Sequence, residues 1–122
     1  IQHFNAYESL AILMYSAMNS ETFAKVKQPV FLGYYYKNDQ EQDFVVSVPK
    51  MLEMFDQLGT PKSLKREQAF PKSGDHVIGS SITSNDWEGV LFASIDFLEN
   101  VVGVPPNPKY QKQVEEMRKP KT

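Results

Sequence analysis

The fold is decided by one run of residues, Pro29-Val30-Phe31-Leu32-Gly33-Tyr34-Tyr35-Tyr36. The run is apolar and aromatic throughout, and no charge interrupts it. Runs of this kind are typical of a β-strand that is covered on both faces, as in a parallel sheet. The sequence therefore predicts a buried strand at this position, with helices on the two faces of its sheet.

A second strand is predicted from Ser63 to Phe70, and it is far more polar than the first. Its centre reads Lys65-Arg66-Glu67-Gln68. Charged side chains discourage pairing between the edges of separate sheets, so they are common on edge strands. We therefore expect this second strand to form the edge of the sheet.

Three further segments repeat apolar residues at the period of a helix. The expected helices cover residues 5–19, 47–59 and 85–102. Asn5, Ser47 and Asn85 stand at their starts, and these residue types cap helix N-termini well. Helices that alternate with strands indicate right-handed crossovers and a parallel sheet, so the predicted fold class is α/β.

Two strands are too few to complete such a sheet. The strand at 29–36 is too apolar for an edge, so it requires a neighbour on its other side. Either the chain extends its sheet through a second copy, or the missing strands belong to a part of the protein that is absent from this sequence.

Composition excludes several classes of protein. At 122 residues the chain has the length of one domain. No apolar run approaches the length of a membrane span. The absence of cysteine excludes disulfides, thiolate nucleophiles and iron–sulfur clusters. A net charge of -2 provides no basic surface for nucleic acid. The two histidines and scattered carboxylates predict neither a metal site nor a cofactor.

The C-terminal residues differ from the rest of the chain. Residues 104–122 carry five basic and two acidic side chains together with four prolines. The sequence therefore predicts an α/β unit over residues 1–103 and a solvated tail over residues 104–122 that contains one or two helical turns.

Candidate catalytic residues follow the two predicted strands. An acidic loop containing Asp39, Glu41 and Asp43 follows the first strand, and a Gly-Asp-His loop containing His76 follows the second. Ligands bind beyond the carboxyl ends of parallel strands, where these two loops are expected to meet. A carboxylate beside an imidazole can hold its tautomer and stabilise its protonated form. The alternative is that the acids are solvated loop residues and that His76 only precedes a helix.

From Val26 to Val101 the chain resembles the C-terminal third of an α/β-hydrolase-fold enzyme. The stretches that carry the resemblance are Pro29-Val30-Phe31-Leu32-Gly33, Asp43-Phe44-Val45-Val46, Gly74-Asp75-His76-Val77 and the helix that ends at Val102. They follow the order strand, triad acid, triad histidine and final helix of that family. Each motif is loose, and the specificity lies in their order and spacing.

The resemblance implies a serine hydrolase that acts on a small-molecule ester or a related acyl substrate, with carboxylic esters as the expected class, Asp43 as the triad acid and His76 as the general base. However, the G-x-S-x-G motif of the family's nucleophile is absent, because no two glycines stand four residues apart. The chain is therefore expected to be a C-terminal fragment that is inactive alone and whose nucleophile lies upstream. Its expected partner is the missing N-terminal part or a second copy. The alternative is a non-catalytic α/β module that completes its sheet by homodimerisation or by binding a partner.

Overall fold

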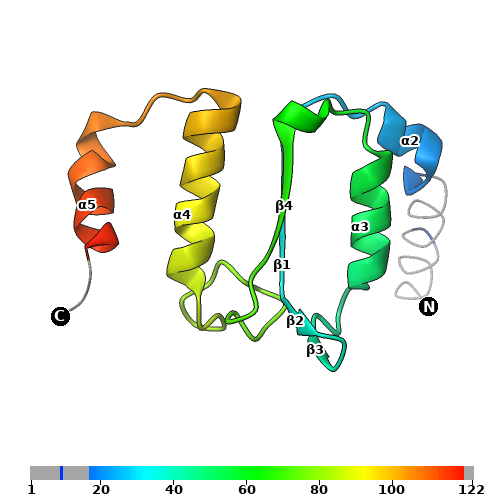
Figure 1. Ribbon diagram of the computed structural model, residues 1–122, viewed down its shortest axis with the longest axis horizontal. Coiled ribbons are helices and arrows are strands. Elements are labelled where there is room, and N and C mark those ends of the chain that lie inside the picture. The colour runs from blue at the N-terminus through cyan, green and yellow to red at the C-terminus, as the bar shows by residue number, and fades with distance from the viewer. Residues whose placement is uncertain (1–8, 10–16, 120–122) are drawn as a thin grey trace.

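The computed structural model describes residue 9 and residues 17–119. In chain order the elements are α2 (Ser20–Ala24), β1 (Val30–Tyr34), β2 (Tyr36–Asn38), β3 (Glu41–Gln42), α3 (Val48–Gln57), a 3₁₀ turn (Lys62–Leu64), β4 (Lys65–Ala69), α4 (Trp87–Phe97), a π-helical turn (Leu98–Val102) and α5 (Pro108–Arg118). Three layers follow from this order, with α3 on one face of the strands β1 and β4 and α4 on the other (Figure 1). The protein is thus of mixed α/β class, as the sequence predicts.

Strands β1 and β4 pair in parallel, in a register that runs from Val30 opposite Lys65 to Tyr34 opposite Ala69. This pairing confirms the two predicted parallel strands. Because opposite residues of a pair share a face, Tyr34 lies on the same face as Lys65 and Glu67. The two strands alone form this sheet within the described part of the chain.

Helix α3 packs on the face that carries Lys65. The Ser47 hydroxyl accepts the N–H of Lys50 and caps the helix, as the sequence predicts. The ammonium of Lys65 donates to the Phe55 carbonyl over 2.8 Å and lies 4.7 Å from the centre of its ring. On the same face the Tyr34 hydroxyl donates to the Glu67 carboxylate over 2.5 Å. Burial and this hydrogen bond raise the pKa of Tyr34, so its hydroxyl keeps its proton at neutral pH.

Helix α4 packs on the opposite face. The rings of Phe31 and Phe97 are 5.4 Å apart, and the Arg66 guanidinium contacts the Asp96 carboxylate over 2.8 Å. The Arg66 hydrogen bond lowers the pKa of Asp96. The charged residues of β4 therefore bind helix α4, in addition to discouraging pairing at the edge of the sheet.

The predicted first strand is too long. β1 ends at Tyr34, and residues 36–42 form the small antiparallel pair β2–β3. The cause is a local turn, because the side-chain oxygen of Asn38 accepts the N–H groups of Gln40 and Glu41 over 3.0 and 2.8 Å. Asparagine stabilises such turns through its side chain, and this turn reverses the chain just before the candidate acid.

One predicted helix start is shifted by one residue, and the predicted end of the first helix lies close to its expected place. Helix α4 begins at Trp87 with Asp86 at its N-cap position, one residue after the predicted cap Asn85, whose N–H donates to the Ser73 carbonyl. Residue 17 is helical and residues 18–19 are not, so the helix stops near Asn19 as predicted, and Asn19 then caps the separate helix α2 by accepting the N–H of Thr22. Most of the predicted first helix lies outside the described residues.

The C-terminal tail is more ordered than predicted. α5 has eleven residues, with Asn107 as its N-cap and a proline in its first turn. All of its contacts are superficial, and none of its residues is buried. The Arg118 guanidinium lies 5.6 Å from the Phe92 ring of α4. No helix in the described part of the chain is both long enough and apolar enough to span a membrane.

Candidate active site

The two residues selected from the sequence meet at the carboxyl edge of the parallel strands. Asp43 directly follows β3, and His76 lies in the loop between β4 and α4. His76 Nδ1 and Asp43 Oδ2 are 2.5 Å apart. Both loops lie at the end of the sheet that is lowest in Figure 1. The pairing expected from strand order is thus present as a direct contact.

Asp43 is held by its own loop as well as by His76. Its side chain is 3% exposed, and its Oδ1 accepts the N–H groups of Val45 and Val46 over 2.8 and 3.0 Å. Its own N–H donates to the Tyr35 carbonyl over 3.0 Å. Burial raises the pKa of Asp43, but the His76 contact and the two backbone N–H groups outweigh burial and hold it below its ordinary value. The carboxyl is therefore ionised at neutral pH.

His76 is the accessible member of the pair. Its side chain is 41% exposed, whereas that of Asp43 is almost fully covered. Because Asp43 engages Nδ1, that nitrogen carries the proton in the neutral ring, and Nε2 is the basic nitrogen. None of the hydrogen bonds formed among residues 17–119 involves Nε2. An imidazole with one nitrogen anchored and the other available can accept a proton from a nucleophile and return it.

The loop that carries His76 is anchored at its base. Ser73 is fully buried, and its hydroxyl and its N–H both donate to the Phe70 carbonyl, over 2.7 and 3.2 Å. The Ser73 carbonyl accepts the N–H of Asn85 over 3.0 Å. Gly74 has a φ of +74°, a conformation that favours glycine. These contacts connect the beginning and the end of the loop, and they hold the backbone that precedes His76 in place.

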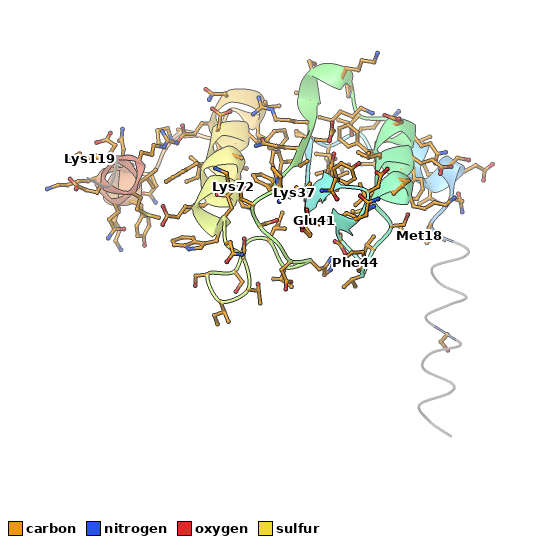
Figure 2. The ribbon with its side chains drawn as sticks, turned by 60° about the horizontal axis from the view of Figure 1, so that its bottom comes forward. Met18, Lys37, Glu41, Phe44, Lys72 and Lys119 are labelled. Carbon is orange, nitrogen blue, oxygen red and sulfur yellow. The ribbon has the colours of Figure 1, made fainter. Side chains whose placement is uncertain are left out.

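A cavity of about 280 Å³ lies beside the pair. Its walls include Tyr35, Gln42, Phe44 and Gly74 as well as the pair itself. Phe44 is 82% exposed, and Figure 2, in which this end of the molecule is turned forward, shows it on the loop near Glu41. A larger cavity of about 400 Å³ lies between α2 and α3 and is lined by the exposed Lys50–Glu53 ion pair but by no histidine, so we place the site at the smaller one.

The other acids considered from the sequence do not contact His76, although Glu41 lines the same cavity. Asp39 accepts the Tyr36 hydroxyl over 2.7 Å in the β2–β3 turn. Glu41 accepts from Asn38, and its oxygen is 3.4 Å from the Lys37 ammonium. These contacts lower the pKa of Glu41. Both acids are exposed, so Asp43 alone among the three has the geometry of an orienting carboxylate.

Sequence reasoning missed the residues that hold the His76 loop. Ser73 was not selected, and Asn85 was expected to cap a helix. The available signal was Gly74, since a glycine directly before the Asp-His pair indicates a backbone turn there. A buried serine has no sequence pattern of its own, so its role is visible only in the structure.

No protein family model, curated protein or solved structure matches the chain. The described residues contain no cluster of three or more histidine, aspartate or glutamate side chains that could hold a metal ion.

Proposed function

We propose that this chain is the C-terminal portion of an α/β-hydrolase-fold serine hydrolase that acts on small carboxylic esters, with Asp43 as the triad acid and His76 as the general base. One observation carries the proposal. A buried, ionised carboxylate contacts Nδ1 of a half-exposed histidine over 2.5 Å, at the carboxyl edge of two parallel strands. The order of strand, acid, strand, histidine and helix supports the fold assignment.

In the proposed reaction His76 Nε2 accepts the proton of a serine hydroxyl while that oxygen attacks the ester carbonyl. The tetrahedral intermediate then breaks its bond to the alcohol oxygen, which takes the proton from the imidazolium. The serine then carries the acyl group as an ester. A water molecule gives a proton to His76 Nε2 and attacks this ester, and the serine oxygen leaves with that proton as the carboxylic acid is released. Asp43 keeps the proton on Nδ1 throughout and stabilises the imidazolium.

The serine comes from a segment upstream of Ile1 in this proposal. No serine of residues 17–119 forms a hydrogen bond with His76. Ser47 caps α3, and Ser73 is buried and donates to Phe70. We call the protein with this upstream segment the full-length hydrolase.

The test compares two acids of one loop in the full-length hydrolase. Asp43→Asn should lower kcat for a p-nitrophenyl ester by roughly 10⁴, because an amide favours the wrong histidine tautomer. Asp39→Asn is the matched control and should change kcat by less than about tenfold, since its charge is solvent-screened. Circular dichroism verifies that both variants fold. If Asp39→Asn lowers kcat strongly and Asp43→Asn does not, Asp43 is not the triad acid. If neither variant lowers kcat by more than about tenfold, the chain has no such triad.

A further inference from the structure

Exposed apolar side chains gather in the two loops that form the candidate site. Phe44 is 82% and Val45 is 73% exposed, and both belong to the loop of the candidate acid. Val77 is 51% and Ile82 is 92% exposed, in the loop that carries His76. Apolar side chains that are exposed as a group mark a surface where a ligand or a partner binds.

Two of these side chains belong to the wall of the candidate site. Phe44 and Val45 line the cavity of about 280 Å³ beside His76, whereas the two exposed apolar residues of the His76 loop do not. The Asp43 carboxylate accepts the N–H of Val45, so the group that holds the imidazole also fixes the backbone at this wall. Ligand pockets usually measure about 300–1,000 Å³, so a cavity of this size fits a short chain.

The formal charges on the wall of this cavity, His76 apart, are all negative. Glu41, Asp43 and Asp75 line it, and no lysine or arginine of the described residues does. Lys37 pairs with Glu41 from outside the wall. A carboxylate or phosphate of a substrate would be repelled by these acids at short range, whereas an uncharged group would not.

The occupant of the cavity also follows from its position. An ester has to reach His76, which lines the same cavity as Phe44 and Val45. A protein segment packed against these two side chains would fill the cavity and keep the ester away from the imidazole. The exposed apolar wall is therefore covered by the substrate.

We infer that the ester substrate carries a short, uncharged apolar group that lies against Phe44 and Val45, and that esters with a carboxylate in place of this group react poorly. The inference deepens the proposed function and rests on it for the reaction. The apolar group belongs to the acid part or to the alcohol part of the ester, since both flank the carbonyl that is attacked. Neutral esters of short-chain acids or alcohols have this chemistry, and half-esters of dicarboxylic acids do not.

An ester series in the full-length hydrolase tests the apolar contact. Phe44→Ala should lower kcat/KM at least about fivefold for ethyl butyrate or for butyl acetate, because each buried methylene contributes about fourfold. Ethyl acetate should lose less than about twofold. A loss with ethyl butyrate assigns the contact to the acid part, and a loss with butyl acetate assigns it to the alcohol part.

Ile82→Ala is the matched control for this series. Ile82 is as exposed as Phe44 but does not line the cavity, so its replacement should leave all three esters unchanged. Equal effects of the two variants, or no effect of Phe44→Ala on either longer ester, would overturn the apolar contact.

A charged ester tests the acidic wall. Ethyl butyrate should have a kcat/KM at least about tenfold above that of monoethyl succinate, in which a carboxylate replaces the terminal methyl group. Asp75→Asn removes one charge and keeps an oxygen that can accept the Val77 N–H, and it should narrow this ratio at least about threefold. A ratio of two esters cancels any effect of the variant on His76 itself.

Asp39→Asn removes the same charge from a carboxylate that does not line the cavity, so it should leave the ratio unchanged within about twofold. A wild-type ratio near one, or equal ratios in the wild type and Asp75→Asn, would overturn the exclusion of anionic esters.

Binding of butyramide separates this inference from the proposed function. In the His76→Gln full-length hydrolase, saturation-transfer NMR should show the propyl protons in contact with the protein, and Phe44→Ala should weaken that signal. If butyramide contacts Phe44 but the wild type hydrolyses none of the esters, the proposed function fails and the apolar contact stands. If hydrolysis depends on His76 but Phe44→Ala behaves as Ile82→Ala does, the inference fails and the proposed function stands.

Discussion

At the scale of single residues, Asp43 combines two tasks. Its Oδ2 contacts His76, while its Oδ1 accepts two backbone N–H groups of its own loop. The same carboxylate therefore orients the imidazole and fixes the loop that positions it. A carboxylate bound in this way is preorganised, since little has to move when the imidazole becomes charged.

The lowered pKa of Asp43 predicts how the stability of the chain depends on pH. A carboxyl whose pKa is lower in the folded state stabilises the fold above its unfolded pKa of about 3.9. This contribution is lost as the pH falls through the folded pKa. The unfolding free energy should thus decline more steeply with acid for the wild type than for Asp43→Asn. Urea unfolding at a series of pH values measures the difference, and parallel pH profiles would contradict it.

Gly74 supplies a backbone conformation that the His76 loop requires. A residue with a Cβ is strained at a φ of +74°, and the added Cβ would lie 3.3 Å from the side-chain nitrogen Nδ2 of Asn85. Gly74→Ala should therefore reduce the unfolding free energy by about 1–2 kcal/mol. Gly79→Ala is the matched control, because nothing lies within 4 Å of its Cβ and its φ is not positive. Urea unfolding compares them, and an equal loss in both variants would show that Gly74 is not special.

At the scale of elements, sequence patterns predicted strands and helix starts correctly where the local preference of the residues agrees with their packing in the fold. The uncharged run at Val30–Tyr34 and the Ser47 cap behave as the sequence indicates. The β2–β3 turn was missed because the apolar run continues through Tyr36, whereas the side chain of Asn38 reverses the chain shortly afterwards. The sequence places the start of the third helix at Asn85, whereas Asp86 holds the N-cap position and the Asn85 N–H bonds to the Ser73 carbonyl, twelve residues earlier in the chain.

The candidate site could be predicted because parallel strands bring their following loops to one edge. That rule places Asp43 near His76 without knowledge of any side-chain contact. It does not select Asp43 over Asp39, which depends on the β2–β3 turn, and it gives no role to the buried Ser73. Distinctions of this kind arise from contacts between residues that are distant in sequence.

Helix α5 is predicted to add little to the stability of the rest. None of its residues is buried, and an exposed cation–π contact such as Arg118–Phe92 contributes about 0.5–1 kcal/mol. Deletion of residues 104–122 should therefore lower the unfolding free energy by no more than about 1 kcal/mol. Ser47→Ala, which removes a helix cap, should have an effect of similar size. Chemical unfolding measures both, and a much larger loss on deletion would show that α5 belongs to the core.

At the scale of the whole molecule, the proposed function accounts for two features of the described residues, which are the unpaired outer edge of β1 and the lack of a serine hydrogen-bonded to His76. Both are satisfied if an upstream segment adds strands to the sheet and supplies the nucleophile.

The most direct test of the central claim is the site at which a fluorophosphonate labels the full-length hydrolase. The reagent reacts with serines that a general base activates. Peptide mass spectrometry should find one labelled serine upstream of Ile1, and His76→Gln should slow the labelling by at least about 100-fold. Residues 1–122 alone should stay unlabelled and should not hydrolyse esters. Labelling of a serine within residues 1–122, or labelling that is independent of His76, would contradict the account.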